Sequence, residues 1–355
     1  MSYTNGLDKP SDYFETKLYT GDDTNNREIS LGLTPDLTWI KARNVAYGHI
    51  LFDRIRGLGF SLNSNNTNAD RNVGSEFGWS NSGCTTDSFT VDRGSNESLN
   101  ESGRPMVAWN WKAGGTASSN TNGSITSSVS ANQDAGFSIV SYTGTGSNAT
   151  VGHSLGTVPS MVIVKRRSNT ENWTVYHNSI GNTKYLNLDT TDSATTFNLW
   201  QNTDPTSSVF SITTHNRLNA NGDTYIAYCF SEKKGYSKFG SYTGNGNADG
   251  TFVYTGFKPA FIMQKSSSVS GTGWHILDVE RSPSNSNFLD ISANSSGAEF
   301  SGSGYRNIDF LSNGFKIRVS AADLNQSGGT YIYMAFAENP FVTSTDTNSI
   351  PTTAR

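Results

Sequence analysis

The chain is poor in charged residues, and this shortage excludes several classes of protein. Charged residues make up 16% of its 355 residues, and the formal net charge is -4. The sequence has no Lys/Arg cluster or basic helix that could attract DNA or RNA. It also has no apolar run long enough to cross a membrane as a helix. We therefore expect neither nucleic-acid binding nor membrane insertion.

Cysteine is equally scarce, with only Cys84 and Cys229 present. They lie at non-equivalent places in the repeats described below, so we expect no disulfide framework. Cys229 follows aromatic and apolar residues in the stretch 225–230, as a small buried hydrophobe would. The polar residues 1–6 do not resemble a signal peptide, so we expect synthesis in a host cytoplasm.

Gly, Ser, Thr and Asn dominate the uncharged part of the sequence, and aromatic residues make up 12%. This mixture is low in helix formers and rich in turn and strand formers, which favours an all-β protein. A chain of this length has room for two or three domains.

One pattern occurs three times: Gly-x-x-Pro, then a short apolar run, then Lys six residues after the Pro. It occupies residues 32–41, 156–165 and 256–265. Each copy follows a Tyr-Thr-Gly, at 19–21, 142–144 and 242–244, and precedes an Asn-x-x-Gly, at 100–103, 219–222 and 325–328. After the Asn-x-x-Gly comes a closing apolar strand. Landmarks in constant order at nearly fixed offsets indicate tandem duplication of a unit of about 100 residues.

The repeats predict three tandem antiparallel β-sandwich (jelly-roll-like) domains. We place them at 1–113 with a short N-terminal arm, 137–236 and 237–341, with a polar tail at 342–355. Residues 114–136 are rich in Gly, Ser and Asn and read as a flexible linker, in which 125–130 could add an edge strand. The direct join at 232–236 predicts that the second and third domains pack closely, with the first placed more independently.

The clearest candidates for chemistry are Asp53, His177 and Asp278, which end the second apolar run of each repeat. The residue type changes between repeats, and no second carboxylate stands at a spacing that glycosidase chemistry would need. We expect turn or cap groups at these positions, and no catalytic residues.

Cofactor and metal motifs are also missing. The five histidines, at 49, 153, 177, 215 and 275, form no metal-binding spacing, and no phosphate loop or nucleophile elbow occurs. We expect no cofactor and no preset transition-metal site. The Asp/Asn-rich loops 22–26 and 245–250 leave calcium open, although such clusters are more often plain turns.

Any receptor contact would have to come from the parts that differ between repeats. The loops 63–82 and 193–208 differ most. Aromatic residues outside the landmarks, namely Trp79, Tyr185, Trp200 and Tyr305, could stack on sugar rings or serve as core or interface anchors. The receptor-binding residues are not identified by the sequence. The repeated Lys41, Lys165 and Lys265 we interpret as strand-end charges at the rim of each sandwich.

Several stretches resemble β-sandwich repeat domains of marine bacteriophage tail-fibre and related virion proteins. They are residues 5–14, 32–41, 107–114, 135–146, 240–246 and 329–341. The resemblance covers nearly the whole chain. It implies a non-enzymatic virion structural protein on the outside of the tail or capsid. Its expected partners are other virion proteins and a host surface glycan or outer-membrane receptor.

We therefore expect a tail-fibre or spike-type appendage engaged in host attachment, with a homo-oligomer, a trimer first, as its assembly. One alternative is a capsid decoration or tail adaptor with a purely structural role. The other is a glycan depolymerase.

Overall fold

The computed structural model describes residues 7, 9–79, 87–94 and 98–340, and strands dominate it. The strands that pair in its sheets do so in antiparallel fashion. Its helices are the short η1 (Pro10–Asp12), α1 (Asn216–Asn219) and α2 (Ala322–Asn325). No helix among these residues has the length and apolar character needed to cross a membrane. The predicted all-β, antiparallel sandwich class is confirmed.

Each repeat forms one large and one small sheet. In the first repeat the large sheet has the order β1 (Phe14–Thr20), β9 (Pro105–Trp111), β3 (Leu37–Ala42), β4 (Ile50–Asp53). The small sheet has the order β2 (Arg27–Ser30), β8 (Ser88–Val91), β7 (Phe77–Trp79). A separate pair joins β5 (Phe60–Ser61) to β6 (Arg71–Asn72).

The second repeat has a longer large sheet. Its order is β10 (Ser118–Asn120), β11 (Ser127–Asn132), β12 (Phe137–Thr143), β19 (Thr224–Phe230), β14 (Met161–Arg166), β15 (Thr174–His177), β16 (Lys184–Asn187), β17 (Thr195–Thr196). The small sheet pairs β13 (Ala149–Gly152) with β18 (Val209–Ile212).

The third repeat returns to the simpler form. Its large sheet has the order β20 (Ser237–Thr243), β27 (Thr330–Pro340), β22 (Phe257–Ser266), β23 (Trp274–Asp278), β24 (Ile291–Ser292). Its small sheet has the order β21 (Phe252–Tyr254), β26 (Gly314–Ile317), β25 (Ile308–Leu311). All three large sheets thus share one strand order: opening strand, closing strand, Gly-x-x-Pro strand, then the second apolar run.

The repeated sequence landmarks hold this topology together. The tyrosine of each Tyr-Thr-Gly is buried and donates its hydroxyl to a leucine carbonyl: Tyr19 to Leu99 (2.9 Å), Tyr142 to Leu218 (2.8 Å) and Tyr242 to Leu324 (2.8 Å). The glycine that ends each Asn-x-x-Gly has a positive φ, of 72°, 78° and 73° in the three repeats. Only glycine adopts such a conformation without strain, which explains its recurrence.

The asparagine of the same motif has a different role from the one its sequence suggests. Asn and Gly together predict a turn in which both residues tolerate positive φ. Instead, Asn100 is fully buried and its side-chain amide donates to the Asp22 carboxylate (2.8 Å) and the Thr24 carbonyl (2.7 Å). Asn325 does the same for Asn245 (2.9 Å) and Asn247 (2.7 Å) in the third repeat. The asparagine therefore fixes the loop that follows the opening strand.

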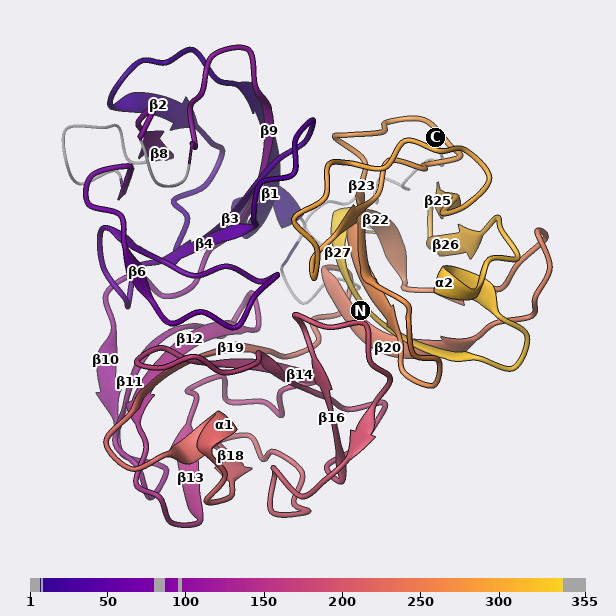
Figure 1. The fold of residues 1–355 in the computed structure, drawn as a ribbon. Helices are drawn as coiled ribbons and strands as arrows, with labels where there is room; N and C mark the ends of the chain where they lie inside the picture. The colour runs from indigo at the N-terminus through magenta and orange to yellow at the C-terminus, as the bar shows by residue number, and fades with distance from the viewer. Residues whose placement is uncertain (1–6, 8, 80–86, 95–97, 341–355) are drawn as a thin grey trace, which may run out of the picture.

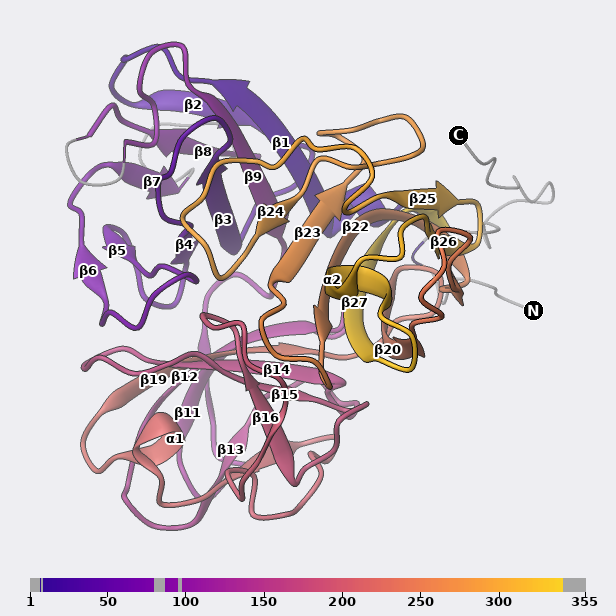
Figure 2. The same ribbon diagram turned by 45° about the vertical axis from the view of Figure 1, so that its right-hand side comes forward.

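The three repeats are arranged in a ring, with their large sheets facing a common centre (Figures 1 and 2). The central strands of each large sheet are buried on both faces. In β19, Ile226, Tyr228 and Phe230 point into the central core shared by all repeats, whereas the alternate residues Ala227 and Cys229 point into the core of the second repeat. Ring contacts such as Trp111 with Phe230 and with Phe336 join residues from different repeats in this central core.

This arrangement corrects the expected packing. The first repeat is not placed more independently than the others, because Phe14 and Trp111 pack directly against Phe261 and Phe336 of the third repeat. Burial of apolar surface stabilises a fold by about 25 cal/mol per Å². Because the central core takes side chains from three repeats, the stability of each repeat depends on the other two.

The expected linker is also corrected in part. Within residues 114–136, β10 and β11 extend the large sheet of the second repeat beyond β12. Composition misled here because Ser and Asn, which are common in linkers, serve as well in a solvated outer strand. The predicted tail 342–355 and Cys84 lie outside the described residues.

Candidate functional site

The equivalent residues Asp53, His177 and Asp278 lie at the interfaces between repeats. Asp53 forms a fully buried ion pair with Arg56 (2.5 Å) and accepts a hydrogen bond from the Tyr228 hydroxyl of the second repeat (2.8 Å). Asp278 likewise pairs with Arg281 (2.6 Å) and accepts from the indole Nε1 of Trp109 in the first repeat (3.0 Å). Both carboxylates bind other groups of the protein, as structural residues do.

His177 takes the same position between the second and third repeats. Its Nε2 lies 3.2 Å from the carbonyl oxygen of Tyr333, and its Nδ1 accepts from the backbone N–H of Ser179. Complete burial lowers the pKa of His177 to about 4, so the neutral ring donates through Nε2 at neutral pH. The predicted turn or cap role is confirmed, because Asp53, His177 and Asp278 each accept a hydrogen bond from a backbone N–H two or three residues further along. The prediction misses the contacts with the neighbouring repeat, because it treats each repeat by itself.

A second acid completes two of the three interfaces. Asp70 lies between Arg56 of its own repeat (3.2 Å) and Arg167 of the second repeat (2.6 Å). Glu299 lies in the same way between Arg281 (2.9 Å) and Arg43 of the first repeat (2.8 Å). An Arg–acid–Arg bridge thus spans each of these interfaces.

The interface between the second and third repeats has the equivalent backbone hydrogen bond but none of the charged side chains. The backbone N–H of Ala194 donates to the Ser267 carbonyl (2.9 Å), as those of Asp70 and Glu299 donate to their partner arginines. Ile180 stands where the other repeats have Arg56 and Arg281. At this interface the acid and both arginines are absent together, so no charge is left unpaired. We therefore interpret the bridges as structural parts of the ring.

The repeated lysines are completely buried, and this corrects their expected place at the rim. Lys165 donates to the Thr67 carbonyl of the first repeat (3.1 Å), and Lys265 to the Thr191 carbonyl of the second (3.3 Å). Lys41 donates to the carbonyls of Ala42 (2.6 Å) and Val45 (3.1 Å). Burial lowers the pKa of each lysine to about 8.

The loops 63–82 and 193–208, where we expected receptor contacts, have a part in these interfaces. Thr67 and Asp70 bind the second repeat, and Ala194 binds the third. Residues 80–86 lie outside the described part of the chain. Loops that vary most between repeats therefore vary in part because each docks against a different neighbour.

The aromatic residues chosen from sequence fall in different environments. Trp200 is buried in the core of the second repeat, and Tyr185 is half-buried beneath the Arg217 guanidinium (5.2 Å from its ring centroid). Trp79 belongs to β7, and its side chain lies outside the described part. Of the three whose side chains are described, only Tyr305 is exposed, with 64% of its surface accessible.

Tyr305 belongs to a loop that is fixed at both ends. Its ring meets that of Phe300 edge to face, with centroids 6.0 Å apart. Phe300 forms a backbone bridge with Asp290, by hydrogen bonds of 3.0 and 2.8 Å. Beside it, Glu299 forms the bridge to the first repeat described above. We call Phe300, Tyr305 and Arg306 the aromatic loop.

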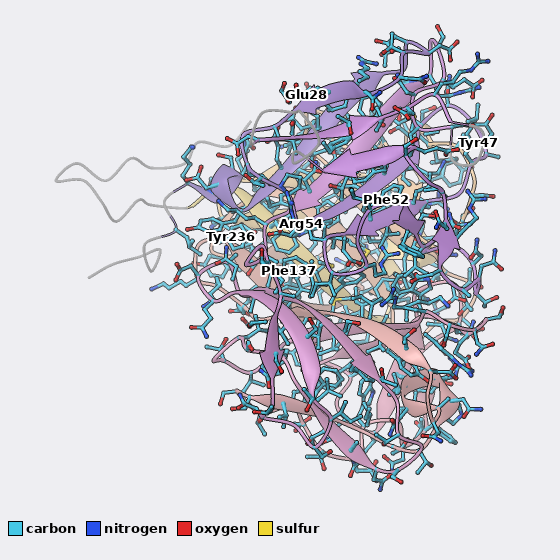
Figure 3. All side chains as sticks on the ribbon, turned by 90° about the vertical axis from the view of Figure 1, so that its left-hand side faces the viewer. Glu28, Tyr47, Phe52, Arg54, Phe137 and Tyr236 are labelled. Carbon is cyan, nitrogen blue, oxygen red and sulfur yellow. The ribbon has the colours of Figure 1, made fainter. Side chains whose placement is uncertain are left out.

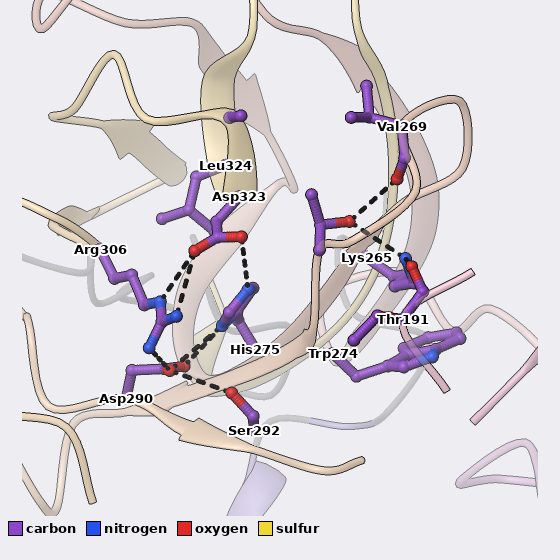
Figure 4. Close-up of polar contacts among 12 residues, drawn as sticks. Thr191, Lys265, Val269, Trp274, His275, Asp290, Ser292, Arg306, Asp323 and Leu324 are labelled. Carbon is purple, nitrogen blue, oxygen red and sulfur yellow. Dashed lines mark hydrogen bonds and ion pairs between the residues drawn. The ribbon is translucent and has the colours of Figure 1, made fainter. Parts of the chain in front are cut away.

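Arg306 anchors the other end of the aromatic loop (Figure 4). Its guanidinium binds Asp290 (3.0 Å) and Asp323 (3.1 Å), and it stacks on the Phe300 ring 4.8 Å from the centroid. Beneath it, the Nδ1 of His275 lies 3.1 Å from Asp290 and its Nε2 lies 3.8 Å from Asp323. Two acids and two bases thus neutralise one another under two exposed rings.

The charges of this cluster are strongly coupled. The pKa of His275 is raised: burial opposes its protonation, but the Asp290 carboxylate and the hydrogen bond to it, together with the nearby Asp323, outweigh burial. The nearby His275 is the main cause that lowers the pKa of Asp323 to about 2. Because both carboxylates are held in ion pairs with Arg306, neither is suited to act as a general acid.

A second pair of exposed rings lies on β21 of the third repeat. Phe252 and Tyr254 are 44% and 61% exposed, on either side of the buried Val253. Val253 pairs with Phe315, as Ile29 pairs with Phe89 and Val151 with Phe210, so the three strands are equivalent. At the two outward positions the first repeat has Glu28 and Ser30, and the second has Thr150 and Gly152. The fold therefore does not require aromatic residues there.

The described residues contain no preformed cluster of metal ligands. Within the described residues, no group of three or more His, Cys, Asp or Glu side chains is placed to hold a metal ion. In the loops 22–26 and 245–250, side-chain oxygens of Asp22 and Asn245 accept hydrogen bonds from Thr24 and Asn247 of the same loops.

Of the exposed rings in the third repeat, the sequence identified only Tyr305 as a candidate. Phe252, Tyr254 and Phe300 were not identified, because their exposure depends on the fold.

Comparison with known proteins gives a family and no function. Residues 9–340 match a family described as a domain of unknown function (DUF7483), and the chain belongs to this family. No curated protein and no solved structure matches the chain.

Proposed function

We propose that this member of the DUF7483 family is a non-enzymatic attachment protein on the outside of a bacteriophage particle, and that its third repeat binds saccharides of the host surface. The observation that carries the proposal is the distribution of exposed rings. Of the six exposed aromatic side chains among the described residues, the third repeat has four: Phe252, Tyr254, Phe300 and Tyr305.

Flat rings held at the surface suit the apolar faces of sugar rings. The aromatic loop is well prepared for this role, because Glu299 and Arg306 fix it through ion pairs before any ligand binds. A ligand then meets a preformed surface, and less conformational entropy is lost on binding. The paired carboxylates beneath the rings favour binding without cleavage.

The resemblance to tail-fibre repeat domains supports placement on a virion, with other virion proteins as partners. Assembly into a homo-oligomer, a trimer first, stays a prediction. The ring of three repeats already gives one chain the approximate threefold arrangement that short fibres obtain by association.

The proposal is tested by incubating the purified protein with host cells and with host-surface polysaccharide. We expect retention on both without release of sugar fragments. Fragment release would instead support a depolymerase, and the absence of retention would support a capsid decoration or tail adaptor with a structural role. The Phe252→Ala/Tyr254→Ala and Phe300→Ala/Tyr305→Ala variants should each weaken retention, whereas Phe197→Ala, an exposed ring of the second repeat, should not.

A further inference from the structure

A cleft lies on a different part of the molecule from the aromatic rings, and it shares no lining residue with them. It has a volume of about 1000 Å³ and lies between the first repeat and the beginning of the second. Arg54 and Leu58 of the first repeat line it on one side, and Lys112, Gly114 and Asp134 on the other. In Figure 3 the labelled Arg54 lies between the strands of the first repeat and Phe137, where β12 begins.

The cleft exists because residues 112–136 have no counterpart of equal length in the join at 232–236. Asp36 fixes the start of this extra segment, since its carboxylate accepts from the backbone N–H groups of Ala113 (2.7 Å) and Gly115 (3.3 Å). Arg54 in turn pairs with Asp36 (2.8 Å). The equivalents of Asp36 in the other repeats are Ser160 and Ala260. The cleft is therefore a fixed feature that the other join, at 232–236, does not reproduce.

Its lining does not resemble a sugar site. Among the described residues that line the cleft, none is aromatic. The wall consists largely of backbone, because residues 113–117 are Ala, Gly, Gly, Thr and Ala. This wall leads directly into β10, the edge strand of the large sheet. An edge strand has backbone donors and acceptors that can pair with an added strand.

Charges of both signs lie on the walls. Lys112 and Arg54 are cationic, and the exposed Asp134 is anionic. A ligand that complements such a cleft has an extended backbone and side chains of both charges, with an apolar group for the exposed Leu58. These are properties of a peptide segment and not of a neutral sugar.

We propose that the cleft binds an extended peptide segment of a partner protein, with an acidic side chain toward Lys112 and a basic side chain toward Asp134. The backbone of the segment runs along residues 113–117 toward β10. Such a site would mount the chain on its partner and leave the rings of the third repeat accessible. It does not depend on saccharide binding by those rings.

The test selects peptides from a displayed random-sequence library on the immobilised full chain. The affinity of the consensus peptide is then measured by fluorescence anisotropy. We expect a consensus that combines an acidic and a basic residue. The Lys112→Glu/Asp134→Lys variant should weaken its binding about tenfold, which corresponds to about 1.4 kcal/mol. A peptide with the two charges exchanged should bind the variant better than it binds the unmodified chain.

Two further variants sharpen the result. Ala117→Trp, which fills the cleft, should abolish peptide binding, whereas Lys184→Glu, a charge change at the exposed first residue of β16, should leave it unchanged. Thermal unfolding checks that each variant is folded. The proposal is overturned if no consensus is enriched, or if the charge exchange has no effect. It is also overturned if Ala117→Trp removes saccharide retention, because the cleft would then be a sugar site.

Discussion

The Tyr228 hydroxyl of the second repeat lies 2.8 Å from the Asp53 carboxylate of the first. The same relationship joins Trp109 to Asp278, from the first repeat to the third. These contacts go around the ring, because each repeat uses its closing strand for one neighbour and the strand of its second apolar run for the other. The molecule is thus built as a closed set of three interfaces within one chain.

The first prediction concerns the buried charge bridge at the interface of the third and first repeats. Arg281→Ile leaves the buried Asp278 without its cation and Glu299 with Arg43 alone. Loss of one member of a buried pair costs about 3–5 kcal/mol. Urea unfolding should show a loss of this size. The matched Arg318→Ile variant removes a half-exposed arginine and should cost less than about 1 kcal/mol.

A transplant between interfaces tests whether the charges act as a set. Five residues of the charged interface between the third and first repeats are replaced by those at the equivalent positions of the uncharged interface between the second and third repeats. The substitutions are Arg43→Ser, Trp109→Met, Asp278→His, Arg281→Ile and Glu299→Ala. No charge is then left unpaired, so the loss should be smaller than for Arg281→Ile alone. A larger loss would contradict the view that the uncharged interface is a self-consistent alternative.

How much of this could be predicted from the sequence depends on whether a residue acts within one repeat or between two. Tyr142 and Gly222 act within a repeat, so their spacing predicted the strands and turns correctly. Lys165 and Asp53 also act between repeats, and the sequence of one repeat does not contain Thr67 and Tyr228, their partners in the neighbouring repeat. A lysine after an apolar run is usually exposed, and only the ring explains why this one is buried.

The exposed rings illustrate the same limit. Phe252 and Tyr254 follow the alternation of an ordinary strand, and sequence alone cannot say which face is outward. Comparison of the three repeats in the structure shows that neither ring has an aromatic counterpart in the other repeats, which have Glu28 and Ser30, or Thr150 and Gly152, at these positions. The expectation that function lies in the parts that differ is therefore useful only after the repeats have been aligned in space.

The second prediction concerns the buried lysines. Their pKa of about 8 in the folded chain lies below the usual 10.5, so the unfolded chain binds more protons between these values. Stability should therefore rise with pH from about 8 upward, by at most about 3 kcal/mol per lysine. Urea unfolding between pH 7.5 and pH 9.5 avoids the range above about pH 10, where buried tyrosines reverse the trend.

Lys165→Met should remove its part of this rise, and Lys184→Met, at the exposed first residue of β16, should leave the pH dependence as it is. If the unmodified protein shows no rise over this range, the lysines are not desolvated in solution as the structure indicates.

The third prediction concerns His275, whose pKa is raised in the folded chain. Its contribution to stability is present below the unfolded pKa of about 6.5 and is lost as pH rises through the folded value. The free energy of unfolding should therefore fall as pH rises above about 6.5, and His275→Asn should not show this fall. His215→Asn should retain it, because the pKa of His215 is lowered. Equal slopes for the unmodified protein and His275→Asn would refute the assignment.

Saccharide binding by the third repeat is tested most directly by calorimetric titration of host-surface oligosaccharide into the full chain. The proposed site predicts that Phe300→Ala/Tyr305→Ala weakens binding by about tenfold or more, since each stacked ring contributes on the order of 1 kcal/mol. The matched Phe197→Ala variant should bind like the unmodified chain. Equal affinities for all three proteins would contradict the central claim.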